Sequence, residues 1–150
     1  MSHNRTTYNV GLLQAKSYRI LKNHLTECLS KYDISAIEWA LVGLLYDHRE
    51  GMRSSTVAKE LGVEASFITA LFSTLKNREL VNIKSDATDS RVKIIYVTPQ
   101  GIEFVEEVEP QVHAQMEYVT QGISPQEHIS YINVLEYIVE KTEKTHTLIN

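Results

Sequence analysis

The spacing of apolar residues changes from a helical to a strand period part-way along the chain. Of all the features of the sequence, this change restricts the possible folds most. A short helix is expected to begin at an N-cap, Ser54 or Ser55, and to end at Gly62, because glycine readily adopts the left-handed conformation that closes a helix. A second helix is expected over about 65–78. Its inward positions are Ile68, Leu71, Phe72 and Leu75.

Two β-branched runs follow these helices. Val81 and Ile83 alternate with polar residues, and residues 92–97 form the second run after a six-residue polar loop at 86–91. Alternation with a period of two on both sides of a polar loop predicts a hairpin. Two short helices joined by a tight turn and followed by a hairpin predict a winged helix-turn-helix.

Longer helices are expected on both sides of this unit. An apolar stripe predicts a helix over 8–31, and a second follows the capping box of Ser35 and Glu38 and continues to about Gly51. The stripe of the first helix consists of Val10, Leu13, Tyr18, Leu21, Leu25, Cys28 and Leu29. These features make the N-terminal part of the chain entirely helical.

The C-terminal part is also expected to be helical. Thr98 caps a helix that extends to about Gln121 and that Pro110 should kink, because proline lacks a backbone donor. A capping box at 124–127 begins the last helix, which continues to about Glu143. The fold class is therefore mainly α, in the order α-α-α-α-β-β-α-α.

The composition excludes several classes of protein. A single cysteine, Cys28, excludes an internal disulfide framework and a cysteine-rich zinc site, and it indicates a cytoplasmic setting. No apolar run approaches the roughly 18 residues of a membrane helix, and the start does not resemble a signal peptide. No catalytic or phosphate-binding motif is present, so we expect neither an enzyme nor a cofactor or metal.

The charge is unevenly distributed along the chain. The formal net charge is -4, yet residues 1–94 carry 13 Lys and Arg against 10 Asp and Glu, whereas residues 95–150 carry 2 against 9. This asymmetry fits a neutral-to-basic binding module joined to an acidic accessory segment.

Residues 37–104 contain a set of residues whose types, order and spacing together form a fairly specific pattern. They are Val57, Ala58, Leu61, Gly62, Val63, Ser66, Ile68, Thr69, Leu71, Leu75, Leu80, Val81, Asp86, Asp89, Arg91, Thr98 and Gly101. With these residues the chain resembles the MarR family of bacterial transcription regulators. Four positions depart from the family's usual pattern: Ala70 replaces a basic residue, Glu79 a glycine, and Ala87 and Ser90 a proline and an arginine of the wing.

The resemblance implies one MarR-like domain over 1–150, with a DNA-binding part at 35–98. It implies that helical segments at 1–34 and 99–150 form a homodimer in which the first and last helices interlock. A recognition helix would enter the major groove and a wing arginine the minor groove. The expected function is a ligand-responsive repressor that binds double-stranded DNA at a pseudo-palindromic operator.

Candidate DNA-contacting residues lie in three places. On the expected recognition helix, the positions left outward are Ser66, Phe67, Thr69, Ala70 and Ser73, whose hydroxyl, small or aromatic side chains can contact several bases or a thymine methyl group. In the wing, Arg91 can enter a narrow minor groove, oriented by paired hydrogen bonds that it donates to Asp89, while Lys84 and Lys93 suit phosphates. At the start of the preceding helix, the candidates are Arg53, Ser54 and Ser55, which either hold a phosphate or only cap the helix.

A small apolar or aromatic effector is expected between the dimerising helices and the DNA-binding part. The candidates, Tyr18, His24, Trp39 and His113, combine rings with polar tips, although they can equally well pack the hinge. Cys28 could instead make the regulator responsive to redox state, or to a metal bound together with Glu38, Glu109 and His113. The same sequence also fits a winged-helix module that binds protein or ligand and has weak or no DNA binding.

Overall fold

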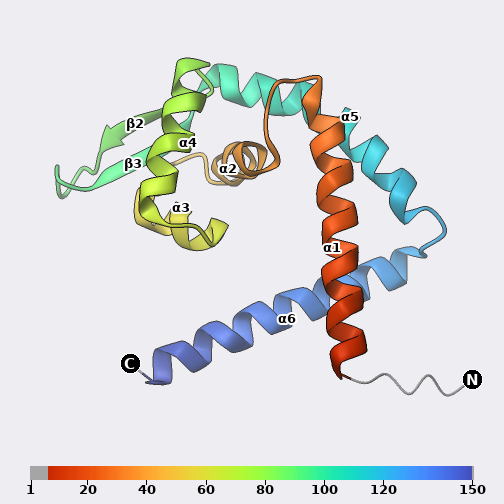
Figure 1. Ribbon diagram of the computed structural model, residues 1–150. Coiled ribbons are helices and arrows are strands. Elements are labelled where there is room, and N and C mark those ends of the chain that lie inside the picture. Colours follow the sequence, from red (N-terminus) through yellow and green to blue (C-terminus); the bar gives the residue numbers. More distant parts are fainter. Residues whose placement is uncertain (1–6, 150) are drawn as a thin grey trace, which may run out of the picture. The chain divides into compact units, whose positions relative to one another are not determined.

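The computed structural model describes residues 7–149, and the side chains of residues 7–142. The described chain is mainly helical with one small antiparallel sheet, which confirms the expected fold class (Figure 1). In chain order the elements are α1 Thr7–Ser30, α2 Ala36–Asp47, β1 Met52–Arg53, α3 Ser54–Leu61, α4 Ala65–Asn77, β2 Val81–Ser85, β3 Lys93–Val97, α5 Pro99–Thr120 and α6 Pro125–Ile149. No helix in this described part is long and apolar enough to cross a bilayer.

The chain divides into two compact units, with the boundary after Met116. The first unit contains the hydrophobic core, to which α2, α4, the sheet and α5 contribute. Its largest fully buried side chains are Leu29, Leu41, Val42, Leu45, Val57, Ile68, Leu75, Val81, Ile95 and Val108. The second unit consists of the end of α5 and α6, whose capping box is formed: the Ser124 N–H donates to Glu127, and the Glu127 N–H donates to Ser124 Oγ.

The helix starts in the first unit largely follow the sequence patterns. The capping box of Ser35 and Glu38 is confirmed, with the Glu38 N–H donating to Ser35 Oγ at 3.3 Å. Thr98 accepts a hydrogen bond from the Gly101 N–H at 3.0 Å, as expected for the cap of α5. In Figure 1 the ribbon of α5 changes direction part-way along its length, in agreement with a proline, Pro110, inside the helix.

The expectation that α2 continues to about Gly51 was wrong. The helix ends at Asp47, and the chain turns and forms β1, a short strand that the sequence pattern did not predict. β1 pairs with β3, which lies between β1 and β2 in the sheet. Gly51 has a φ of 88°, and a Cβ at this position would lie 2.7 Å from Ile94 Cγ2, so only glycine lets the chain approach β3 this closely.

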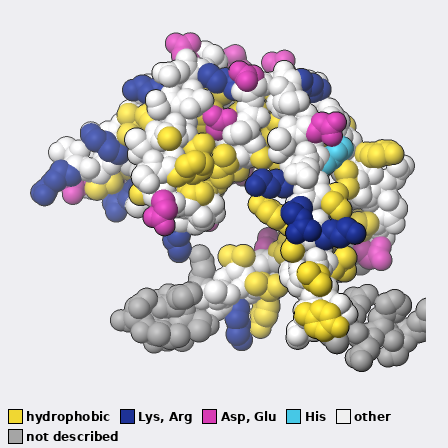
Figure 2. All heavy atoms as spheres, viewed as in Figure 1, with side chains coloured by type: hydrophobic (Ala, Val, Ile, Leu, Met, Phe, Trp, Pro, Cys, Tyr) yellow, Lys and Arg dark blue, Asp and Glu magenta, His cyan; other side chains and the backbone are white. Residues whose placement is uncertain are grey.

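The apolar stripe of α1 is buried only at its C-terminal end. Cys28 and Leu29 are buried, whereas Leu13 and Tyr18 are 67% and 65% exposed. Within residues 125–142 of α6, the large apolar side chains are exposed as well: Ile129, Tyr131, Ile132, Val134, Leu135, Tyr137, Ile138 and Val139. α6 also extends to Ile149, beyond the expected end at about Glu143. Figure 2 shows hydrophobic side chains on the visible surfaces of both helices.

Glu79 has a φ of 58°, so the residue after α4 is left-handed. A Cβ in this conformation costs on the order of 1 kcal/mol relative to glycine. We expect Glu79→Gly to raise the melting temperature by about 2–4 °C. Glu79→Ala, which removes the charge but keeps the Cβ, should leave the melting temperature nearly unchanged. Differential scanning calorimetry of the two variants checks this, and an equal rise in both would attribute the gain to charge instead.

Candidate nucleic-acid interface

A glycine turn orients the two helices of the helix-turn-helix. Gly62 ends α3 with a φ of 64°, and its N–H and that of Val63 donate back to carbonyls of α3. Three residues of α4, Ile68, Leu71 and Leu75, are buried against the core. Because they occupy one face of the helix, the five predicted contact positions lie on the exposed surface of α4: Ser66, Phe67, Thr69, Ala70 and Ser73. Their contact with DNA remains a prediction.

The wing loop is ordered by one carboxylate. Asp86 Oδ1 accepts hydrogen bonds from the backbone N–H and the hydroxyl of Thr88, at 2.8 and 2.6 Å, and from the Asp89 N–H at 3.3 Å. Asp86 Oδ2 lies 3.7 Å from Arg53 Nη2 in β1. Asp86 therefore connects the wing loop to the strand that precedes α3. The sequence pattern assigned no role to this residue beyond the resemblance.

The Arg91 side chain is exposed at the hairpin, with 93% of its surface accessible. The expected paired hydrogen bonds from the guanidinium to Asp89 are not formed, which corrects that prediction. Arg91 Nε lies 3.7 Å from Asp89 Oδ1, too far for a hydrogen bond, and the same oxygen accepts the Arg91 backbone N–H at 3.0 Å. Asp89 thus shapes the loop and leaves the guanidinium accessible to a ligand.

Two lysines accompany Arg91 on the hairpin. Lys84 Nζ lies 5.4 Å from the centre of the Tyr96 ring, and Lys93 Nζ donates to Ser85 Oγ at 3.4 Å. Both side chains are exposed. Figure 2 shows Lys and Arg side chains gathered on the projecting hairpin. The wing therefore presents a positive surface in a chain whose net charge is negative.

The start of α3 differs from the expectation. The N-cap is Arg53, without a side-chain cap, so neither Ser54 nor Ser55 caps the helix as predicted. Both serines instead lie in the first turn of α3, because β1 extends up to Arg53 and keeps that residue in strand conformation. Arg53 is partly engaged by Asp86, and Ser55 is exposed.

Arg78 is a structural residue that sequence reasoning missed. Its guanidinium donates to the backbone carbonyls of Tyr32, at 3.0 Å, and of Asp33, and it lies 5.4 Å from the Phe104 ring centre. It thereby joins the end of α4 to the turn after α1 and to α5. A basic residue at the C-terminal end of a helix was the available signal, since such residues commonly bind free carbonyls.

Hydrogen bonds from Thr88, through its side chain and then its backbone, and from Asp89 hold the pKa of Asp86 below its ordinary value of 3.8. The stabilisation that this carboxylate gives to the wing is therefore present above its ordinary pKa and is lost as pH falls through the lower value. Thr88→Ala should raise the pKa of Asp86 towards the ordinary value. Carboxyl-carbon NMR titration measures this, with Thr26→Ala on α1 as control. An unchanged Asp86 titration would contradict the assigned cause.

The four effector candidates have different surroundings. His24 Nε2 lies 3.0 Å from the Gln115 carbonyl oxygen, and Trp39 packs edge-to-face on Phe104, whereas Tyr18 and His113 are exposed. Two surface hollows, of about 260 and 480 Å³, border the end of α4 and the start of α5, and none of the four lines either. Their effector role remains a prediction. Among the described residues, no three His, Cys, Asp or Glu side chains are grouped as metal ligands.

No family model matches the chain. Solved structures nevertheless match it over most of its length. A MarR-family regulator from Rhodococcus sp. RHA1 superposes with a TM-score of 0.82, covering 90% of this chain and 95% of that one, at 21% sequence identity. The chain has the MarR fold.

The MarR fold is shared with two regulators solved as complexes. CouR from Rhodococcus jostii RHA1, bound to p-coumaroyl-CoA, has a TM-score of 0.79 and 21% identity, covering 86% of this chain and 90% of CouR. MepR from S. aureus, in complex with DNA, has a TM-score of 0.72 and 23% identity, covering 91% and 99%. The HTH-type transcriptional regulator MhqR of Bacillus subtilis (strain 168) is 23% identical over 116 residues, 77% of this chain and 79% of MhqR.

Proposed function

We propose that this protein is a sequence-specific transcription regulator that binds a pseudo-palindromic operator as a homodimer. The observation that carries the proposal is a combination within one compact unit: α4 has an exposed outer face, and the hairpin presents the almost fully exposed guanidinium of Arg91. A helix of this kind fits the major groove, and an exposed arginine on an adjacent hairpin fits the minor groove. The solved complex of MepR with DNA supports this assignment.

The exposed apolar residues of α1 and α6 support the homodimer. Helices with large apolar surfaces bury them against a partner, since isolated patches of this extent are unfavourable in water. We place the dimerisation part in segments 1–34 and 99–150 and the DNA-binding part in 35–98. We place the regulator in the cytoplasm, which its single cysteine favours, and we assign it no catalytic activity.

A ligand-responsive repressor is the form of regulation we favour, supported by the complex of CouR with p-coumaroyl-CoA. A ligand would release DNA only if it binds the DNA-competent and DNA-incompetent forms with different affinities. The rings and polar tips of Tyr18, His24, Trp39 and His113 favour a small apolar or aromatic ligand on this chain.

Selection from a random duplex library tests the proposal. The expected result is a two-fold motif whose half-sites lie about one helical turn apart. Binding should weaken steeply with salt, because Lys and Arg contacts to phosphates release counterions. Absence of enrichment at low salt would reject DNA binding by the free protein and favour a protein- or ligand-binding module. The acidic Glu64 at the start of α4 would be compatible with such a module, because a module that does not bind DNA has no phosphates for the carboxylate to repel.

A further inference from the structure

The exposed surface of α4 lacks the residues that most often read bases. Lys76 is the one Lys or Arg in the helix, and it lies nine residues after Phe67, about 14 Å along the axis. Its ammonium group is also 5.7 Å from the Phe72 ring centre. Bidentate contacts from arginine or lysine to guanine, the commonest specific contact in the major groove, are therefore not available near the start of α4.

The hydroxyl groups of this surface are partly engaged with the helix itself. Thr69 Oγ1 faces the Ala65 carbonyl oxygen at 3.5 Å, and Thr74 Oγ1 donates to the Ala70 carbonyl at 3.3 Å. These threonines consequently have less hydrogen-bonding capacity for bases. The residue one turn before Phe67, Glu64, carries a carboxylate that repels phosphates.

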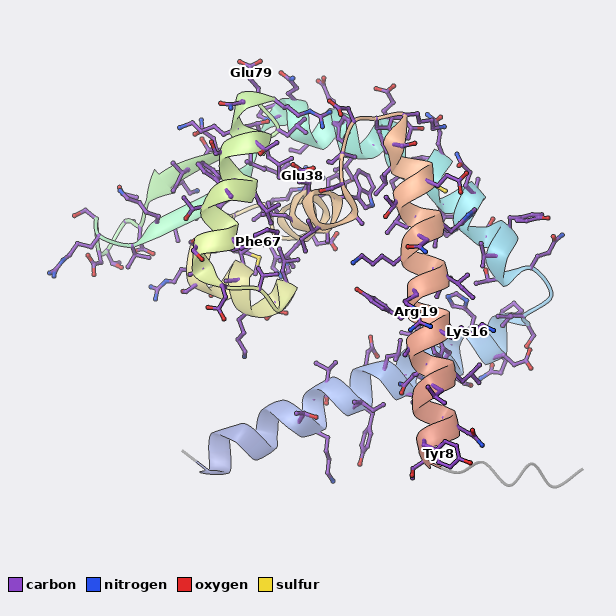
Figure 3. All side chains as sticks on the ribbon, in the orientation of Figure 1. Tyr8, Lys16, Arg19, Glu38, Phe67 and Glu79 are labelled. Carbon is purple, nitrogen blue, oxygen red and sulfur yellow. The ribbon has the colours of Figure 1, made fainter. Side chains whose placement is uncertain are left out.

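Phe67 is the large side chain of this surface. It lies in the first turn of α4, where recognition helices contact base edges, and it is 45% exposed (Figure 3). The exposed residues Ala65, Ser66 and Ala70, which lie near it in α4, are small. The one apolar group that a base pair presents in the major groove is the C5-methyl group of thymine.

We propose that Phe67 determines specificity for thymine, by packing its ring against the C5-methyl group of one thymine in each half-site. This inference rests on the proposed DNA-binding function. The contact removes both the exposed aromatic surface and the methyl group from water, which is favourable. It also discriminates thymine from every unmethylated base.

Deoxyuridine scanning of the selected operator tests this proposal, because deoxyuridine lacks the methyl group but keeps the hydrogen-bonding edge of thymine. One substitution per half-site removes two methyl groups and should raise the Kd of the wild type by about 15-fold, which is about fourfold for each buried methyl group. The Kd of Phe67→Ala should be insensitive to the same substitution. Phe67→Leu should keep part of the sensitivity, and Ser73→Ala, on the same exposed surface, should keep all of it.

The outcomes separate the two proposals. If selection recovers no motif, the proposed function fails and this inference fails with it. If a two-fold motif is recovered but every thymine tolerates deoxyuridine, or Phe67→Ala keeps the wild-type sensitivity, the inference alone is overturned. Thermal melting of Phe67→Ala, expected to match the wild type because the ring lies on the surface, shows that any change reflects binding.

Discussion

Gly101→Ala should lower the free energy of unfolding by about 3 kcal/mol, the upper range for overpacking a buried site. A Cβ on Gly101 would lie 2.1 Å from the Leu80 carbonyl oxygen and 2.7 Å from Val97 Cγ2. The carbonyl is backbone, and it already accepts the Thr98 N–H at 3.1 Å, so it has little room to move. The methyl group would therefore separate α5 from the base of the wing.

Gly43→Ala in α2 is the matched control. No heavy atom outside its own helix backbone and chain neighbours lies within 4 Å of a Cβ at this position. Alanine is the better helix former, so this variant should be stabilised by about 0.5–1 kcal/mol. Urea denaturation measures both changes. A destabilisation of Gly101→Ala no larger than 0.5 kcal/mol, on the order of an ordinary surface substitution, would show that α5 and the wing are not in close contact.

Arg91→Ala should weaken operator binding by about 30-fold or more, since each of the two wings in the proposed dimer loses a contact worth at least about 1 kcal/mol, which is about 2 kcal/mol in total. The side chain is almost fully exposed, so the fold should be unaffected. Titration of labelled operator at several salt concentrations measures the loss and the number of phosphate contacts.

Two further variants separate the role of the Arg91 guanidinium from a general effect of positive charge. Arg91→Lys keeps the charge but not the planar guanidinium, and it should recover only part of the affinity. Lys31→Ala removes one positive charge near the α1–α2 turn, away from the hairpin, and should change the Kd little. If the Kd of Arg91→Ala equalled that of the wild type or that of Lys31→Ala, Arg91 would have no role of its own in DNA binding.

Much of the fold was predictable because it depends on neighbours in sequence. The capping boxes, the left-handed Gly62 and the change of period from α4 to the hairpin are local features, and each is present in the structure. The outward positions of α4 followed from the same periodicity, because fixing the inward face fixes the outer one.

The features that were missed depend on contacts between distant segments. β1 is two residues long, and it forms because Met52 and Arg53 pair with β3, more than forty residues later in the chain. Arg78 is placed by carbonyls in the turn after α1, and Asp86 by its pairing with Arg53. No local period marks such contacts. The exposed half of the α1 stripe is a further case, because periodicity identifies an apolar face without identifying what covers it.

The β1–β3 pairing restricts how the proposed ligand could control DNA binding. β1 lies immediately before α3, and it is hydrogen-bonded to the strand that carries the wing. The helix-turn-helix and the wing hairpin are therefore joined through this sheet, and in the proposed complex neither could be withdrawn from DNA alone without breaking it. In the proposed dimer, a ligand would accordingly act on the distance and phase between two rigid halves. Control would then be exerted through geometry, by setting which operator spacing fits, rather than by weakening individual contacts.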